Sequence, residues 1–269
     1  MKILILNYEF PPLGGGAGNA TYYLLKQFAG QSGIAIDLVT SSSGSFRIDH
    51  FAENIKVHYL DIGKNENSLH YQTGKDILTY TFKAFRYARK LKKEKRYSLC
   101  HAFFGIPCGF IAMFLSLPYM VSLRGSDVPF CNSRFHWPDK LIFRRLSRLI
   151  WKKAKYVVAN SEGLKDLALK TAPELDIKVI YNGVDTEQFY KEKKKVAGDK
   201  LKLISTGRLI ERKGYRYLIE ALEGKKKVEL TLIGEGNLKG YLEDLAEENG
   251  IDVYFPGRVE HEDLKTLFK

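Results

Sequence analysis

Hydrophobic residues along this chain follow two different periods in turn. Short apolar runs predict buried strands, and between them apolar residues recur at the three- and four-residue spacing of helices. Strands are expected over residues 2–7, 34–40, 55–60, 99–104, 119–123, 156–159 and 178–181. Helices are expected from the glycine run at 14–18 to Phe28, and over 75–95, 106–115, 141–155 and 162–170. This alternation predicts an α/β fold with a largely parallel sheet.

A charged segment divides the chain into two predicted domains. Residues 191–200, KEKKKVAGDK, lack apolar periodicity, and we interpret them as a linker between domains 1–190 and 201–269. In the second domain the pattern predicts strands over 201–205, 229–233 and 252–255, and helices over 214–223, 238–248 and from 262 onward. Three strand–helix units make about half of a doubly wound domain.

Positive charge is concentrated in one part of the sequence. The 269 residues carry a net charge of +12, yet the segment from Lys83 to Lys155 has seventeen Lys or Arg against three acids, a net charge of +14. The rest of the chain is therefore slightly acidic. Such asymmetry indicates an anionic partner, for which a membrane surface, a nucleic acid and an acidic substrate are the candidates.

The helix expected at 141–155, LIFRRLSRLIWKKAK, mixes apolar and basic residues and carries Trp151 near its end. A basic amphipathic helix of this kind can lie on an anionic membrane, and the neighbouring basic helix favours that interpretation. The alternative is an ordinary surface helix whose apolar stripe packs on the sheet. A nucleic-acid partner is not expected, because the aromatic residues of the basic region fall at helical spacing, as core residues do, and do not suggest a stacking platform. These residues are Phe82, Phe85, Tyr87 and Phe143.

The cysteines and the N-terminus predict a cytoplasmic protein. Cys100, Cys108 and Cys131 are odd in number and lack metal-ligand spacing, which argues against a disulfide framework and a zinc site. Cys100 and Cys108 lie in apolar surroundings and are expected to be buried thiols. The chain opens on a strand too short for a signal peptide, and no apolar run reaches the ~18 residues of a spanning helix.

Two loops are candidate phosphate sites. The run Gly14-Gly15-Gly16-Ala17-Gly18 follows the first strand and opens a helix, where backbone N–H groups can approach a phosphate. Its spacing is not that of the dinucleotide-binding motif, and a flexible turn is the alternative. The second loop, STGRLIERKG, presents Arg208 and Lys213 after a strand. Two cations there suit a diphosphate, and a solvated basic loop is the alternative.

Seven segments together resemble the retaining glycosyltransferases of GT-B architecture, in the nucleotide-sugar-dependent group classed as family four. They are YEFPPLGGGAGNATYYL, SLRGSDVP, VVANSEGLKDL, VIYNGVDTEQF, STGRLIERKGYRYLIEAL, LIGEGNLKGYLEDLAEENG and VYFPGRVEHEDL. They span the whole chain in the family's order and spacing. The resemblance implies two Rossmann-like domains, an N-terminal one for the acceptor and a C-terminal one for most of the sugar nucleotide.

The resemblance also implies roles for particular residues. Gly15 and Gly16 would lie against the donor sugar or its diphosphate. Arg208 and Lys213 would bind the diphosphate and stabilise the charge that develops on the leaving group, without a metal or cofactor. Gly234 and Gly236 would let the backbone approach the nucleotide.

Two further positions follow from the resemblance. Arg258 falls near where the family holds the base. Asp127 lies where the family often places a polar residue close to the reacting sugar, although a turn cap is an equal alternative for this carboxylate. Many members have His where this chain has Arg124, which leaves the identity of that group open.

The chain also departs from the family pattern. The family continues with a further strand and a pair of glutamates eight residues apart that hold the donor, whereas this sequence stops at Lys269. We therefore expect a truncated chain with impaired activity and an uncovered apolar face on its second sheet.

The expected activity is transfer of a hexose, with retention, from a UDP- or GDP-sugar to a hydroxyl of a lipid or surface glycan. This activity would serve polysaccharide synthesis for the cell envelope. The protein is expected in the cytoplasm or on the inner face of the membrane, where the basic region 83–155 would contact the anionic surface. The alternative is a non-catalytic fragment that binds a nucleotide, a membrane or a partner chain.

Overall fold

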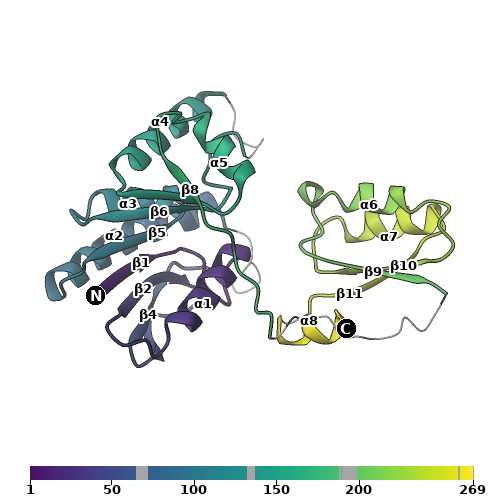
Figure 1. Cartoon of the computed structure of the whole chain (residues 1–269), viewed down its shortest axis with the longest axis horizontal. Helices are drawn as coiled ribbons and strands as arrows, with labels where there is room; N and C mark the ends of the chain where they lie inside the picture. Colours follow the sequence, from purple (N-terminus) through teal and green to yellow (C-terminus); the bar gives the residue numbers. More distant parts are fainter. Residues whose placement is uncertain (65–71, 132–136, 188, 190–198, 260, 269) are drawn as a thin grey trace. The chain divides into compact units, whose positions relative to one another are not determined.

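A computed structural model describes residues 1–64, 72–131, 137–187, 189, 199–259 and 261–268. The chain forms two compact units, Met1–Asn182 and Gly183–Lys269 (Figure 1). Most of the predicted linker, 191–200, lies outside the described residues. No helix within the described ranges is long and apolar enough to cross a membrane.

An eight-stranded sheet with the order β3-β4-β2-β1-β5-β6-β7-β8 organises the first unit. Its strands are β1 (Lys2–Leu6), β2 (Ala35–Ser42), β3 (Arg47–Ala52), β4 (Ile55–Asp61), β5 (Leu99–Phe103), β6 (Tyr119–Leu123), β7 (Tyr156–Ala159) and β8 (Ile177–Val179). Strand β3 pairs antiparallel with β4, and the other pairs are parallel. The predicted α/β class and parallel sheet are confirmed.

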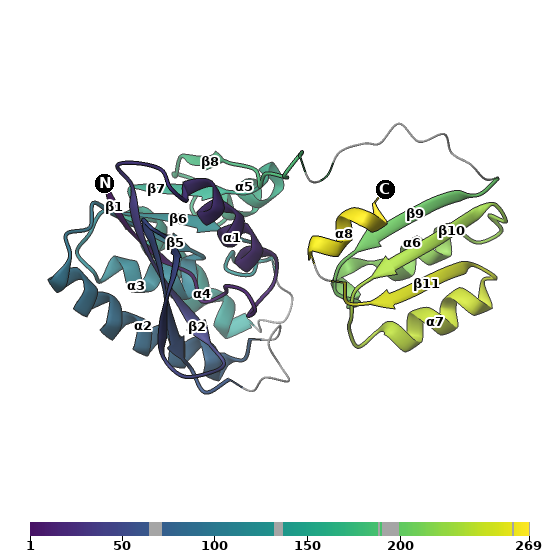
Figure 2. The same cartoon turned by 90° about the horizontal axis from the view of Figure 1, so that it is seen from below.

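Helices cover both faces of this sheet. They are α1 (Gly16–Phe28), α2 (Gly74–Glu94), α3 (Phe110–Met113), α4 (Trp137–Lys153) and α5 (Glu162–Leu169), with an irregular helical turn, η2 (Gly105–Gly109), before α3. Helix α1 lies on one face, and α2, α3 and α4 lie on the other (Figure 2). Helix α3 contacts both α2 and α4, so these three helices form one layer.

The core of the first unit lies between the sheet and these helices. Strand β1 is almost completely buried because both of its faces are covered, as expected for a central parallel strand. Helix α2 begins with a capping box, in which the Thr73 side chain accepts from the Asp76 N–H and the Asp76 carboxylate accepts from the Thr73 N–H. The predicted cap Ser161 accepts from Leu164 N–H at the start of α5. Cys100 and Cys108 are buried thiols, as predicted.

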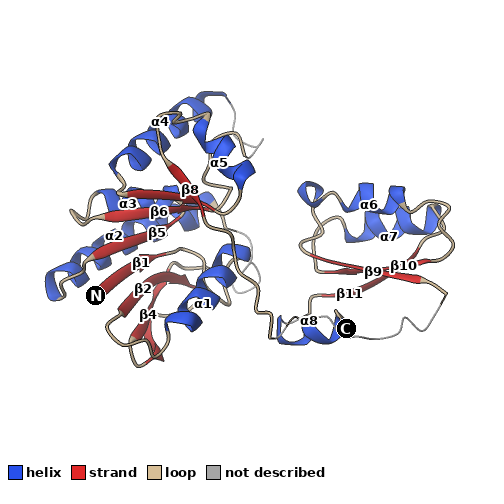
Figure 3. Ribbon diagram, in the orientation of Figure 1, coloured by secondary structure: helices blue, strands red, loops and turns tan. Residues whose placement is uncertain are grey.

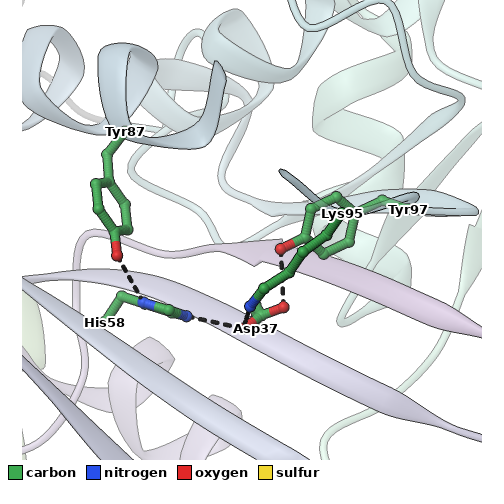
Figure 4. A network of polar contacts seen from close by, with 5 residues as sticks. All are labelled: Asp37, His58, Tyr87, Lys95 and Tyr97. Atoms are coloured by element: carbon green, nitrogen blue, oxygen red, sulfur yellow. Dashed lines mark hydrogen bonds and ion pairs between the residues drawn. The ribbon is translucent and has the colours of Figure 1, made fainter. Parts of the chain in front are cut away.

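A buried polar network fastens the end of α2 to the sheet (Figure 4). The Asp37 carboxylate, on β2, accepts hydrogen bonds from Lys95 Nζ at 2.7 Å and from the Tyr97 hydroxyl at 2.8 Å, and it lies 2.8 Å from His58 Nε2. The other ring nitrogen of His58 lies 2.9 Å from the Tyr87 hydroxyl. Burial acts to raise the pKa of Asp37, but these partners outweigh it and hold the pKa well below its usual range.

Three sequence expectations differ from the structure of this unit. Strand β3 was not predicted, and the helix expected at 106–115 is confined to α3 and the turn η2. Phe82, expected to be a core residue, is exposed, as is Leu78 one turn before it, and the buried side of α2 carries Tyr80 and Ala84. Trp151, near the end of the predicted basic amphipathic helix, is buried in the core.

The second unit has a three-stranded parallel sheet with the order β11-β10-β9 (Figure 3). Its elements are β9 (Leu201–Thr206), a 3-10 turn η3 (Glu211–Lys213), α6 (Tyr215–Ala221), β10 (Val228–Ile233), α7 (Lys239–Glu248), β11 (Asp252–Gly257) and α8 (His261–Leu267). Its buried cluster joins the inner faces of α6 and α7 to β10, through Ile219, Leu242, Leu230 and Leu232.

Candidate functional site

The carboxyl ends of β1 and β5 mark a switch point in the first sheet. From β1 the chain moves to β2 on one side, and later it returns to β5 on the other side of β1. Open α/β sheets bind ligands outside the carboxyl ends of their strands at such a point. Asn7, just after β1, fixes the following helix, because its Nδ2 donates to Thr21 Oγ1 at 2.8 Å.

The glycine run lies at this switch point and opens α1. Gly14 is held with φ +90°, and a Cβ there would come within 2.5 Å of Glu9 Cβ, so only glycine fits. Gly15 and Gly16 are exposed, and a Cβ on either would meet nothing within 4 Å. The Glu9 carboxylate accepts from Gly15 N–H at 3.2 Å and so anchors the loop. Gly15 and Gly16 thus present open backbone at the helix N-terminus.

Asp127 is buried at the carboxyl end of β6 and is surrounded by backbone donors. Its Oδ1 accepts from the N–H groups of Arg124 and Gly125 at 2.9 and 3.1 Å, and its Oδ2 accepts from Gly105 N–H at 2.6 Å. Burial raises the pKa of this carboxyl, although the donated hydrogen bonds oppose the rise. The geometry is that of a cap that ties the loop after β6 to the turn η2. A direct catalytic role for Asp127 stays a prediction.

Arg124 lies beside this cap and presents its guanidinium at the same edge of the sheet. The guanidinium carbon lies 4.6 Å from the centre of the Phe103 ring, and Nη1 donates to Asn182 Oδ1 at 2.7 Å. Burial lowers the pKa of Arg124, and Asp127 acts in the opposite direction. Burial and this guanidinium also lower the pKa of the nearby His101 to about 3, so His101 is neutral at physiological pH.

In the second unit, backbone hydrogen bonds tie together the loops that follow the three strands. Gly207 N–H donates to the Ile233 carbonyl at 2.9 Å, and Gly234 N–H donates to the Gly257 carbonyl at 2.8 Å. A further bond of 2.9 Å runs from Leu209 N–H to the Glu235 carbonyl. We call this set of bonds the loop ladder. It fixes the carboxyl edge of the second sheet as one piece.

Gly234 and Gly236 have a definite role in the loop ladder. A Cβ on Gly234 would lie 2.0 Å from the Gly207 carbonyl oxygen, and one on Gly236 would lie 2.1 Å from the Leu209 carbonyl oxygen. The close approach that these two glycines permit is therefore that of one loop to its neighbour. Their contact with a nucleotide, implied by the resemblance, stays a prediction.

The predicted cations stand on this edge. Arg208 follows Gly207 and is exposed, as is Lys213 at the end of η3. The Lys213 chain runs beside Gly207, since a Cβ on that glycine would lie 3.6 Å from Lys213 Cε. The exposed Arg258 directly follows β11. The structure therefore places Arg208 and Lys213 around one glycine, and Arg258 at the end of a different strand of the same sheet.

Sequence reasoning did not single out Glu9, Asn7 or Gly207 as supports of these loops. The hydrogen-bond partners of Asn7 and Glu9 at the glycine run and α1 lie six or more residues away in the sequence, and no short sequence motif indicates such contacts. Gly207 lies within the second candidate loop, but its place in the loop ladder depends on a neighbouring strand.

Comparison with known proteins assigns the family. The profile of Glycosyltransferase Family 4 matches residues 14–188, and that of Glycosyl transferases group 1 matches residues 186–269. The chain belongs to glycosyltransferase family 4. The family named from the seven sequence segments is therefore confirmed.

Relatives of this family 4 glycosyltransferase include two uncharacterised glycosyltransferases of Methanocaldococcus jannaschii. One is 25% identical over 299 aligned positions, which cover 100% of this chain and 72% of the relative. The other is 34% identical over 154 positions, which cover 52% of this chain and 38% of the relative.

Solved structures share the fold of this glycosyltransferase. Sucrose-phosphate synthase from Thermosynechococcus elongatus has a TM-score of 0.76 at 16% identity, over 99% of this chain and 72% of the other. Anabaena HepE, solved with UDP and glucose, has a TM-score of 0.69 at 19% identity, over 99% and 71% of the two chains. These matches confirm the GT-B architecture.

Proposed function

We propose that this family 4 glycosyltransferase transfers a hexose from a UDP- or GDP-sugar to a hydroxyl of a lipid or surface glycan, with retention at the anomeric carbon. The observation that carries the proposal is the pair Arg208 and Lys213, which stand around Gly207 on an edge fixed by the loop ladder. The structural neighbour HepE, solved with UDP and with UDP-glucose, supports a nucleotide-sugar donor.

The chemistry explains why two cations on this edge matter. The acceptor oxygen bonds to the anomeric carbon as the bond from that carbon to the diphosphate oxygen breaks, and the hydroxyl proton passes to the departing diphosphate or to water. Negative charge then gathers on the departing diphosphate, and the Arg208 guanidinium and Lys213 ammonium stabilise it most where the charge is largest. Donors that are already in place need no rearrangement during the reaction, which makes this term large. In this proposal no metal or other cofactor is required.

The glycine run supplies the second part of the proposal. Gly15 and Gly16 are exposed and have open space where a Cβ would lie, at the N-terminus of the thirteen-residue helix α1. The positive end of a helix dipole favours an anionic group such as a diphosphate. We therefore assign these glycines to the donor, Arg258 to the region of the base, and the first unit to the acceptor.

The test begins with binding of UDP and GDP by calorimetry and continues with release of the nucleoside diphosphate from UDP-glucose and GDP-mannose. Arg208→Ala and Lys213→Ala are each expected to lower kcat about 10²- to 10³-fold. Arg212→Ala, an exposed neighbour in the same turn η3, is the matched control and should retain activity. Chelation of divalent metals should leave the rate unchanged.

The proposal fails if Arg208→Ala and Arg212→Ala lose activity equally, because the charge of the loop would then act without positional specificity. Binding of nucleotides without turnover of any nucleotide sugar would favour the non-catalytic alternative.

A further inference from the structure

Helix α2 has a wider apolar surface than its packing on the sheet requires. Leu78 is 72% exposed and Phe82 is 63% exposed, although helical spacing predicts them on the buried side. The residues of α2 that the sheet covers are Tyr80, Ala84, Ala88 and Leu91. Leu78 and Phe82 are four residues apart and therefore adjacent on the outer face of the helix.

Basic residues continue the same outer stripe of α2. The exposed basic residues of this stripe lie three or four residues from their neighbours in it, before Leu78 and after Phe82. They are Lys75, Arg86, Arg89 and Lys93. The Arg86 guanidinium carbon lies 5.5 Å from the centre of the Phe82 ring, so charge and apolar surface touch. Among the described side chains of this helix, the exposed acid is Glu94, which lies 3.9 Å from Lys90.

Helix α4, in the same layer, repeats the arrangement. Ile142 is 69% exposed and Leu149 is 44% exposed, and both lie on one face with the exposed Arg145 and Lys153. Arg148 and Lys152, which border this face of α4, pair with Glu174 at 3.0 and 2.8 Å.

The short helix α3 lies between these two helices and ends beside a half-exposed Phe114. The outer surface of the layer α2–α3–α4 thus combines five exposed apolar side chains with a strong excess of positive charge. We call it the basic-apolar face. It is defined by Leu78, Phe82, Phe114, Ile142 and Leu149 with Lys75, Arg86, Arg89, Lys93, Arg145 and Lys153.

We propose that the basic-apolar face binds an anionic lipid bilayer, with Leu78 and Phe82 inserted at the headgroup boundary and the surrounding cations on lipid phosphates. Helices with an apolar stripe beside Lys and Arg lie in this interfacial plane. Anionic headgroups attract each basic residue held near the surface. Trp151, near the end of α4, is buried and does not belong to this face.

A nucleic acid is the competing partner, and the structure changes the argument against it. Phe82 is exposed and does not belong to the core, so its spacing no longer excludes base stacking. The exposed aliphatic side chains decide between the two. Leu78, Ile142 and Leu149 offer nothing to a phosphate backbone or a base, whereas each gains from transfer into a lipid boundary.

The test is co-sedimentation of the full chain with vesicles of phosphatidylcholine alone, or of phosphatidylcholine with phosphatidylglycerol. Binding is expected only with the anionic lipid, and it should weaken as salt rises. Arg86→Gln, Arg89→Gln and Lys93→Gln should each weaken binding about fivefold, and roughly a hundredfold together. Leu78→Ser with Phe82→Ser should weaken it at least about tenfold.

The matched control replaces two exposed apolar residues elsewhere in the first unit, Ile48 on β3 and Ile180 after β8. Ile48→Ser with Ile180→Ser should bind the anionic vesicles as the wild type does. Far-UV circular dichroism establishes that each variant is folded. In Phe82→Trp, quenching by brominated lipids beyond that of the wild type should report insertion directly.

Three results would overturn the proposal. They are equal binding to both kinds of vesicle, equal losses in the Leu78/Phe82 variant and in the Ile48/Ile180 variant, and retention on DNA without retention on vesicles. The measurement uses no sugar nucleotide, so its outcome is independent of the proposed transferase activity.

Discussion

From the loop ladder we expect three glycine-to-alanine substitutions in the second unit to change the free energy of unfolding by different amounts, one of them in the opposite direction. Gly234 has φ +142°, and a Cβ there would lie 2.0 Å from a backbone oxygen. Gly236 faces a similar clash at 2.1 Å without a positive φ. Gly240, inside α7, has nothing within 4 Å of a Cβ. The series therefore separates backbone strain, steric overlap and helix propensity.

Each substitution has an expected magnitude. Alanine at Gly234 combines strained dihedrals, about 1–3 kcal/mol, with overpacking of similar cost, so we expect a loss of about 2–6 kcal/mol. Gly236→Ala carries the overlap alone and should cost about 1–3 kcal/mol. Gly240→Ala should stabilise the unit by about 0.5–1 kcal/mol, because alanine loses less backbone entropy in a helix. A unit of this size is stable by roughly 4–13 kcal/mol.

Amide hydrogen exchange read by mass spectrometry is the appropriate assay, since peptides from the first unit serve as an internal reference. Peptides covering β9 and β10 should exchange fastest in Gly234→Ala, less fast in Gly236→Ala, and more slowly than the wild type in Gly240→Ala. If Gly234→Ala protects these strands as well as the wild type does, or if Gly240→Ala is as damaging as Gly234→Ala, the loop ladder does not hold this edge together as argued.

Three further predictions concern the first unit. Asp37→Ala should destabilise it by about 3–5 kcal/mol in urea unfolding, because Lys95 would keep a partly buried charge without its partner; a loss below ~1 kcal/mol would contradict this. The pKa of His101 is lowered to about 3, so its contribution to the free energy of unfolding should be complete above pH ~6.5. Below that pH the free energy of unfolding should fall by up to about 1.4 kcal/mol per pH unit, because the unfolded chain binds a proton that the folded chain does not. His101→Gln should flatten this slope between pH 7 and 5. Burial raises the pKa of Cys100 and Cys108, so a thiol reagent should label Cys131 first and all three only in denaturant.

Continuous apolar runs made most of the fold predictable. The strands at Tyr119–Leu123 and Tyr156–Ala159 match their predicted bounds, because buried parallel strands leave an unbroken hydrophobic signal. Strand β3 was missed because half of its sequence, RIDHFA, is polar and most of it lies exposed at the sheet edge. An edge strand needs polar residues to limit unwanted pairing, and this removes the signal that reveals it.

The sequence named candidate site residues, which stay predictions, but it could not show their geometry. Arg208 and Lys213 could be named because two cations after a strand have an obvious chemistry. The Asp127 cap could not be distinguished from a catalytic carboxylate, because its donors include Gly105, which is distant in sequence. Likewise, the exposure of Leu78 and Phe82 could not be read from periodicity, which shows how wide an apolar stripe is and not how much of it the sheet covers.

In the loop ladder, the position of each loop does not depend on which side chains the loop carries. The bonds that align the three loops come from backbone groups, and one of them uses the carbonyl of Glu235 and not its carboxylate. Replacing the side chains of Glu235 or Arg258 would therefore alter what this edge offers to a ligand while the backbone keeps its course. Single substitutions of these side chains can therefore test the proposed nucleotide contacts with little risk to the fold.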